Sequence, residues 1–212
     1  MRRTAVGAIL VAMPMLAADA DISHLINQIE VRYNRARTLE VGFSESYGFP
    51  GRAQRTETGE LYLRKPGRMR WQYTEPAGKL FVSDGKLIYS YSPNTGRAEK
   101  TKLKETEDMR APLAFLLGRL EFRKDFRSFD AKPDGANTFI TAQPKSDRFP
   151  YKQVAFLVTP EAEIRRLVVT LQDSSVLEFN FDDEKVNPAL SGKLFEFTPP
   201  PGVETVDLTG ER

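Results

Sequence analysis

Apolar residues recur at spacings of three and four in the first part of the chain. They are Ile22, Leu25, Ile26, Ile29, Tyr33 and Ala36. This spacing places an apolar stripe along one side of a helix, so the sequence predicts an amphipathic helix over residues 21–37, with Asp21 as its N-cap. From Leu39 the period changes to two, because Leu39, Val41 and Phe43 alternate with polar or small residues. This alternation is typical of a strand with one buried face.

The period-two pattern continues along most of the remaining chain, in segments separated by turn residues. It predicts strands over residues 59–65, 67–73, 79–83, 86–91, 97 onward, 126–132, 137–144, 153–159, 164–172 and 175–182. Short connections such as Pro66-Gly67 and Asp84-Gly85 favour antiparallel pairing of neighbouring strands. Between residues 102 and 121 the alternation stops, and clustered apolar residues after an acidic run predict a brief second helix.

Together these elements predict a mainly β fold. A large twisted sheet tends to curl, and two short helices cannot cover a whole face of it. We therefore expect a single open (unclosed) antiparallel β-barrel of about ten or eleven strands with a lid of short α-helices. The chain shows no internal repeat of fixed period and no low-complexity tract.

The N-terminus has the layout of a secretory signal peptide. Arg2 and Arg3 precede an uncharged stretch over residues 4–18, and small residues stand at Ala18 and Ala20. The stretch is too short to span a bilayer, and no later segment is apolar enough to do so. The sequence therefore predicts a signal peptide over residues 1–20 and a single domain over residues 21–212.

Charge and cysteine content narrow the class of protein. The formal net charge is +2, and removal of Arg2, Arg3 and Asp19 with the signal peptide would lower it to +1. A near-neutral balance gives no long-range attraction to nucleic acid or anionic lipid. The chain has no cysteine, so an exported domain must be held together by its core rather than by disulfides.

Residues that could carry catalysis or bind metal are scarce. The lone histidine, His24, falls in the first turn of the predicted helix and has no evident partners for a catalytic triad or a zinc site. Acidic clusters over residues 105–108 and 182–184 stand beside turns or helix starts, where carboxylates cap backbone amides or face water. No glycine-rich phosphate loop is present. We therefore predict no enzymatic activity, no catalytic residues, no metal and no cofactor.

Two compositional features leave alternatives open. Leu63, Met69, Trp71 and Tyr73 alternate with the basic residues Arg64, Lys65, Arg68 and Arg70. This mixture could indicate nucleic-acid binding or a docking face for a protein partner, but a strand pair with one solvated and one buried face explains it more simply. Phenylalanine occurs fourteen times against one tryptophan. Such an aromatic face could be ordinary core packing, or part of it could line a cavity for an apolar ligand.

Several short motifs occur in order along nearly the whole predicted domain. They are GELYLRKP at 59–66, RWQY at 70–73, EP at 75–76, LFVSDGK at 80–86, YSP at 91–93 and FEFTPPPGV at 195–203. One motif alone would mean little, but their order, the chain length and the N-terminal signal together make the match specific. On these motifs the chain resembles the LolA family of periplasmic outer-membrane lipoprotein carrier proteins.

The resemblance implies an unclosed barrel with a helical lid, and a carrier of lipoprotein acyl chains. It implies two partners, a lipoprotein-releasing ABC transporter in the inner membrane and a lipoprotein receptor at the outer membrane. The family's basic residue that holds the lid to the barrel rim falls on Lys65, where the family usually has arginine. Lysine lacks the planar fork that makes two hydrogen bonds at once, so the lid could be held less firmly.

The family position that falls on Met69 suits a promiscuous apolar surface, because the thioether is flexible. The predicted apolar cavity combines two strands with the two lid helices. Its residues are Leu61, Leu63, Met69, Trp71, Tyr73, Leu113, Leu116, Leu117, Ile22, Leu25, Ile26 and Ile29. Two rival functions use the same barrel: a lipid-binding sensor or regulator of the cell envelope, and a carrier of another lipid. The expected protein is a monomer in the periplasm that binds no nucleic acid.

Overall fold

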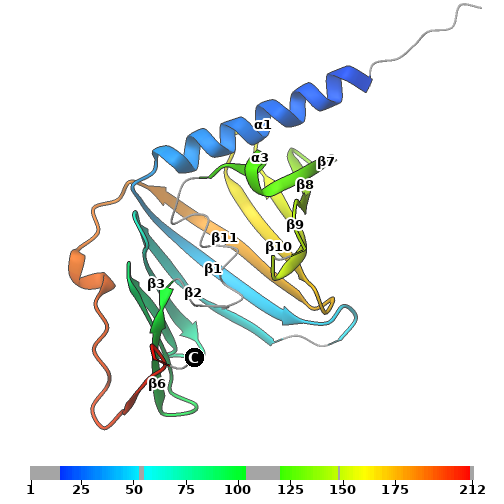
Figure 1. Cartoon of the computed structure of the whole chain (residues 1–212). Coiled ribbons are helices and arrows are strands. Elements are labelled where there is room, and N and C mark those ends of the chain that lie inside the picture. Colours follow the sequence, from blue (N-terminus) through cyan, green and yellow to red (C-terminus); the bar gives the residue numbers. More distant parts are fainter. Residues whose placement is uncertain (1–14, 53–54, 104–119, 148, 211–212) are drawn as a thin grey trace, which may run out of the picture.

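The computed structural model of this protein describes residues 15–52, 55–103, 120–147 and 149–210, with side chains from residue 22 onward. Within these residues the chain forms one sheet of twelve strands, in the order β12-β6-β5-β4-β3-β2-β1-β11-β10-β9-β8-β7 (Figure 1). The strands are β1 Thr38–Gly48, β2 Arg55–Arg64, β3 Arg68–Glu75, β4 Leu80–Asp84, β5 Leu87–Ser92, β6 Arg97–Lys102, β7 Phe126–Asp134, β8 Asn137–Pro144, β9 Tyr151–Val158, β10 Ile164–Leu171, β11 Val176–Val186 and β12 Thr205–Asp207. The predicted mainly β fold is confirmed, with one or two more strands than expected.

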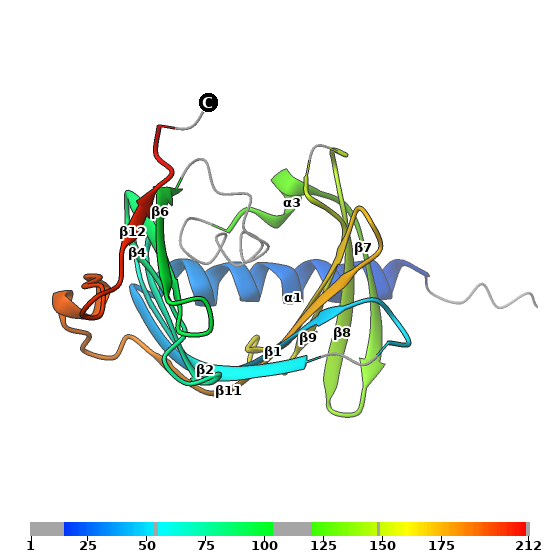
Figure 2. The same cartoon turned by 90° about the horizontal axis from the view of Figure 1, so that it is seen from below.

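The sheet curls into an open half-barrel. Seen from below, β3–β6 form one wall, β7–β10 form the other, and β1, β2 and β11 form the floor between them (Figure 2). Neighbouring strands are antiparallel except β12, which runs parallel to β6. Gly59 marks the bend between β2 and β3, because the register shifts there and a Cβ would lie 2.3 Å from the Gln72 carbonyl oxygen. Only glycine fits such a close approach.

The helix α1, Met15–Arg35, lies across one end of the half-barrel (Figures 1 and 2). It begins before Asp21, so the predicted N-cap at that residue is wrong, and His24 does not lie in the first turn. The predicted apolar stripe does face the sheet: Ile26, Ile29 and Tyr33 are buried, whereas His24 on the opposite side is exposed. Burying this stripe is the main favourable term that holds the helix on the sheet.

The core lies on the concave side of the sheet. The inward residues of β1, β2 and β3 alternate with more exposed ones, as the period-two pattern predicted. Phe139 does not belong to the buried aromatic face. It alternates along β8 with the buried Ile140 and therefore lies on the outer side of the sheet. Inward-facing positions therefore come from strands distant in sequence, which the curl brings around one concavity.

The C-terminal segment covers part of the convex side. After β11 the chain forms a short 3-10 helix, η3 Gly192–Phe195, and then β12. Phe195 and Val82 are buried there, and Arg70 Nη1 donates to the Leu194 carbonyl oxygen at 3.3 Å. Arg70 is half-buried, and burial lowers its pKa. The expectation that this basic face is simply solvated is therefore wrong at Arg70.

The predicted second helix falls largely on residues 104–119, outside the described residues, as do the acidic residues Glu105, Glu107 and Asp108. The segment that follows is described: Leu120 is buried, and α3, Phe122–Asp125, forms a single turn next to α1 (Figure 1). Among the described helices, none combines the length and apolar character needed to cross a bilayer. The predicted signal peptide over residues 1–20 stays a prediction.

Candidate functional site

The C-terminal end of α1 is fixed to the sheet by a buried polar network. Arg32 Nη2 lies 2.5 Å from Glu184 Oε1, and the Tyr33 hydroxyl donates to Glu184 Oε2 at 2.7 Å. The same hydroxyl accepts a hydrogen bond of 2.9 Å from the backbone N–H of Ile164. Three polar groups thus join α1 to β11 and β10, in an environment where leaving any of them unpaired would be costly.

Tyr33 and Glu184 are both screened from water. Tyr33 is buried, and burial together with the negative charge of Glu184 raises the pKa of its hydroxyl well above the ordinary value. The Glu184 side chain is 6% exposed. The expectation that the acids at 182–184 cap backbone amides or face water is therefore wrong for Glu184. The antiparallel register brings the end of β11 beneath α1, and no local sequence signal indicates that.

Lys65, at the turn between β2 and β3, makes a second connection to the helix. Its Nζ donates to the carbonyl oxygen of Tyr33 at 2.7 Å, and its backbone N–H donates to the Arg37 carbonyl oxygen at 2.9 Å. Burial lowers the pKa of the Lys65 ammonium. The carbonyl of Tyr33 belongs to the last turn of α1, where such oxygens have no partner within the helix. A hydrogen bond therefore joins Lys65 to a carbonyl oxygen of α1, and its role in holding a lid stays a prediction.

A polar clamp joins α1 to the segment before α3. The Asn34 side chain both donates to the Leu120 carbonyl oxygen at 2.9 Å and accepts from the Leu120 N–H at 2.7 Å. Glu30 Oε1 accepts a bond of 2.6 Å from the Phe122 N–H, and Arg123 Nη2 donates to Ser23 Oγ at 2.8 Å. Glu30 and Asn34 are one helical turn apart, so they form one edge of α1. Sequence reasoning did not find this clamp.

The first wall of the concavity continues into the floor strand β2, and together they contain the five predicted strand residues. Leu61, Leu63, Met69, Trp71 and Tyr73 are all buried and share the inner face of β2 and β3. Neighbouring aromatic rings pack edge to face on this wall, including the ring of Phe43 with those of Trp71 and Tyr73 at centroid distances of 4.8 Å and 5.2 Å. Near the far end, the Tyr73 hydroxyl donates to Glu45 Oε2 at 3.0 Å.

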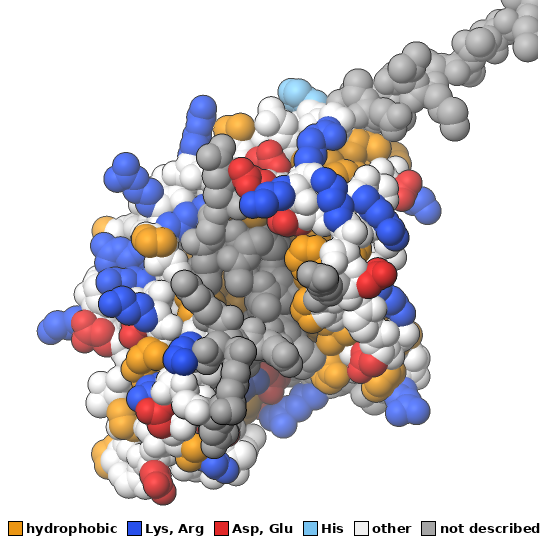
Figure 3. Space-filling model, viewed as in Figure 1, with side chains coloured by type: hydrophobic (Ala, Val, Ile, Leu, Met, Phe, Trp, Pro, Cys, Tyr) orange, Lys and Arg blue, Asp and Glu red, His pale blue; other side chains and the backbone are white. Residues whose placement is uncertain are grey.

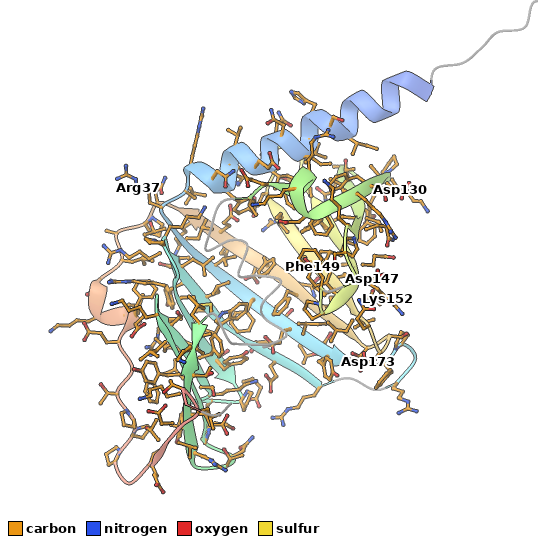
Figure 4. The ribbon with its side chains drawn as sticks, in the orientation of Figure 1. Arg37, Asp130, Asp147, Phe149, Lys152 and Asp173 are labelled. Carbon is orange, nitrogen blue, oxygen red and sulfur yellow. The ribbon has the colours of Figure 1, made fainter. Side chains whose placement is uncertain are left out.

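The opposite wall is aromatic too, and it was missing from the predicted site. Its rings contact one another within 5.2–6.4 Å between centroids, and they belong to Phe122, Phe126, Phe129, Phe149, Tyr151 and Phe156. Phe149 points from the β8–β9 connection toward the middle of the half-barrel (Figure 4). Side chains coloured as hydrophobic gather along this inner wall (Figure 3). The number of phenylalanines signalled such a face, but the pairing of β7–β10 was needed to locate it.

The four predicted residues of α1 differ in how deeply they are buried. Ile26 and Ile29 are buried in the same core as the walls, and Ile22 and Leu25 pack against it while partly exposed. The predicted Leu113, Leu116 and Leu117 lie outside the described residues. Ile29 and the first wall therefore meet in one continuous apolar cluster, with α1 as its cover at one end of the half-barrel.

A groove of about 1220 Å³ opens between α1 and the rim of the sheet. It is lined by Asn27, Glu30, Val31, Asn34, Arg35, Arg37, Thr38, Arg64, Lys65, Pro66 and Asn187. Of the predicted site residues only Lys65 is among these described lining residues. Arg37 stands where α1 meets β1 (Figure 4), and its N–H is held by Asn187 Oδ1 at 2.8 Å. Most charged residues that line the groove are basic, whereas the concave walls are apolar.

Among the described residues, no three His, Asp or Glu side chains converge as metal ligands would. The features present at this end of the fold are apolar walls, a covering helix and polar bonds that hold the helix.

Comparison with known proteins gives consistent results. A family model described as "Outer membrane lipoprotein carrier protein LolA" matches residues 35–198. An outer-membrane lipoprotein carrier protein from Pectobacterium carotovorum is 28% identical and covers 96% of each chain. One from Nitrosomonas europaea is 25% identical over 85% of this chain and 88% of its own. Among solved structures, an uncharacterized conserved protein from Thermus thermophilus matches the fold with a TM-score of 0.52, at 10% identity over 88% of this chain and 99% of its own.

Proposed function

The chain belongs to the LolA family, and on that premise we propose that it is a soluble periplasmic carrier of lipoprotein acyl chains. In this proposal the protein takes the acyl chains from the inner membrane, shelters them against the concave face of the half-barrel, and delivers them to the outer membrane. The observation that carries the proposal is the concave face itself: two apolar walls face each other, and a single amphipathic helix crosses one end of the space between them.

The free energy of exposing an acyl chain to water determines how much apolar surface a carrier must supply. Burial of each methylene gains about 0.8 kcal/mol, so one chain of ~16 carbons represents roughly 12 kcal/mol of hydrophobic free energy. A carrier must therefore offer apolar surface of comparable extent. Wall residues such as Leu61, Trp71 and Phe156 are buried, so a ligand can reach them only when the groups packed against them move aside.

We expect the lid to open by displacement of α1 and of the adjoining segment that carries Leu113, Leu116 and Leu117. Opening breaks the contacts of Ile26 and Ile29 with the sheet. The free energy needed to break them lowers the net free energy of ligand binding, so the ligand binds less tightly. A bound state weakened in this way can pass its cargo onward without ATP. Lys65 takes part through its bond to α1, and the other predicted wall residues through the surface they provide.

The partners in the proposal are a lipoprotein-releasing ABC transporter in the inner membrane and a lipoprotein receptor at the outer membrane. The carrier itself acts as a monomer and contributes no catalytic step. The relatives named as outer-membrane lipoprotein carrier proteins, matched over most of their length, support this assignment.

The direct test is to isolate the mature protein from the periplasm and analyse it by native mass spectrometry. We expect a fraction with bound lipoprotein or acylated peptide, and binding of an apolar fluorescent probe once the cargo is removed. Repeated isolation without lipid, together with no probe binding, would refute the carrier function. Proteins that co-purify separate the rivals: a transporter indicates the carrier, and a membrane-bound signalling protein indicates a regulator.

A further inference from the structure

The indole N–H of Trp71 is buried without a hydrogen-bond partner. It is the one buried side-chain nitrogen or oxygen among the described residues that lacks a partner, and Trp71 is 0% exposed. Buried donors are nearly always paired, because an unpaired one has lost its bonds to water and gained nothing in exchange. An orphaned donor in the middle of an apolar wall therefore calls for a functional explanation.

The surroundings of the ring explain why the donor is unpaired. The Trp71 ring packs against Phe43 at a centroid distance of 4.8 Å and against Phe179 at 5.4 Å. Its partners in the neighbouring strands are Leu61 of β2 and Phe81 of β4. All four side chains are hydrocarbons without a lone pair. Other polar groups on this face, such as the hydroxyls of Tyr73 and Ser83, have partners, whereas the indole N–H of Trp71 has none.

The position on the wall is also defined. Trp71 lies opposite Leu61, which precedes the rim residue Lys65 by four residues in a region of extended chain. At about 3.3 Å per residue, the indole lies roughly 13 Å from the rim, well inside the half-barrel. A ligand group that reaches this donor must enter the concavity, because a group held at the rim cannot touch it.

Resting on the proposed function, we propose that Trp71 Nε1–H donates a hydrogen bond to an acyl carbonyl of the ligand, the ester or amide group that joins a hydrocarbon chain to its head. A carbonyl is an acceptor with no hydrogen of its own, so one bond to the indole satisfies it in an apolar site. A hydroxyl would bring an additional donor, and a carboxylate would bring a charge. The indole thereby fixes where the polar end of the acyl chain stops along the wall.

The chain contains one tryptophan, which makes the test specific. In a ¹H–¹⁵N spectrum of the protein the indole gives one resonance, assignable without mutation. Two probes of equal chain length and chain number would be titrated: a dioctanoyl glycerol and its dioctyl ether. We expect the ester to move the indole proton downfield and to bind roughly five- to tenfold more tightly than the ether, a weaker acceptor.

Trp71→Phe keeps an aromatic ring on the wall and removes only the N–H and part of the ring. In this variant the preference for the ester over the ether should fall to about onefold, although both probes bind more weakly. Tyr89→Phe is the matched control, because it removes an aromatic hydroxyl on the outer side, where Tyr89 stacks on Phe197 at 5.1 Å. It should keep the full carbonyl preference.

The outcomes distinguish this inference from the carrier function. The carbonyl contact is refuted if both probes bind equally and shift the indole resonance by the same amount. It is also refuted if the indole proton stays upfield, as expected for an N–H that lies over the face of an aromatic ring such as Phe43. In both cases the carrier function stands. If no probe binds and the isolated protein carries no lipid, both fail. Should Trp71→Phe not fold, the resonance of the unmodified protein alone decides between these outcomes.

Discussion

The side chain of Lys65 reaches from the rim of the sheet to the last turn of α1, and its bond to the Tyr33 carbonyl is one of few polar links between the two. The ammonium is half-buried, and its lowered pKa reflects the cost of partly removing it from water. A single bond from a lysine gives a weaker hold than the forked guanidinium usual in the family. In the proposed carrier, this bond is one of those that hold α1 over the sheet.

Lys65→Leu should therefore loosen the lid without unfolding the sheet. A hydrogen bond to a charged group contributes about 1.5–3 kcal/mol, but the variant also removes a partly buried charge. We expect the free energy of unfolding to change by less than about 1 kcal/mol and the rate of uptake of an apolar fluorescent probe to rise about tenfold. Lys65→Arg should slow uptake, and Lys86→Leu, on an exposed turn, should leave it unchanged. Equal uptake rates in all four proteins would remove Lys65 from the lid.

The ionisation of buried tyrosines, among them Tyr33 of α1, affects the free energy of unfolding at high pH. Burial first, and then the charge of Glu184, raise the pKa of Tyr33 above its ordinary value of 10.0, and burial raises the pKa of Tyr151 to about 12. Above pH 10 the unfolded chain loses these protons while the folded protein keeps them. The folded state then binds more protons, so the free energy of unfolding falls as pH rises.

We therefore expect chemical denaturation at a series of pH values to show constant stability up to about pH 10 and a decline from there through pH 12. Tyr151→Phe should reduce the slope of that decline, because phenylalanine has no proton to lose. Tyr91→Phe, which changes a partly exposed tyrosine of β5, serves as the control. A slope in Tyr151→Phe equal to that of the unmodified protein would contradict the assignment.

At the scale of elements, α1 is fixed at two edges by different means. Toward β10 and β11 it is held through Tyr33 and Glu184, and toward α3 through Asn34 and Glu30. At the edge toward α3, side chains of α1 bond to the backbone of the segment over residues 120–122, which pairs with no strand. Asn34 supplies both a donor and an acceptor to Leu120, as a neighbouring strand would. The clamp makes α1 and the segment before α3 move together.

Asn34→Ala should separate these two elements. Two backbone groups of Leu120 lose their partner, so we expect the free energy of unfolding to drop by about 1–3 kcal/mol. Hydrogen exchange at the Leu120 and Phe122 amides should accelerate well beyond that of amides in β1. Asn27→Ala is the matched control, since Asn27 is an exposed residue of the same helix and no described residue bonds to its side chain. Exchange at Leu120 that stays as slow in Asn34→Ala as in the control would show that the clamp is not needed.

Local pattern predicted the elements well, and what it missed depends on distant pairing. Alternation and turn residues located eleven of the twelve strands, with bounds close to those observed, because each strand has one buried face. The strand β12 has three residues and no apolar alternation, so its pairing with β6 could not be inferred. Glu184 and the Asn34 clamp were missed for the same reason. Glu184 lies 152 residues from Arg32 in sequence, and the register of β1 with β11 brings it to the helix. Leu120 lies 86 residues from Asn34.

For the whole molecule, the distribution of contacts along α1 predicts how it opens. The polar anchors and the bond from Lys65 involve Glu30 to Asn34, near the C-terminal end of the helix. Residues 22–29 are held mainly by apolar contacts, with the Ser23 to Arg123 bond as the described exception. An incoming acyl chain offers the sheet the same kind of contact and competes for it directly. The helix should therefore swing away from its N-terminal side while its last turn stays attached, and the bond from Lys65 limits how far that turn can pivot.

Hydrogen exchange followed by mass spectrometry, with the protein empty and then loaded with dioctanoyl glycerol, checks this movement. On loading, amides of residues 22–29 should exchange faster, whereas those of residues 32–36 and of β1 and β11 should stay protected. Tyr33→Phe supplies the contrast: with the hydroxyl gone, Glu184 and the Ile164 N–H lose a partner, and the last turn should exchange faster even in the empty protein. If loading instead protects the whole of α1, the helix closes over the ligand, and an acyl chain must enter the half-barrel without displacing it.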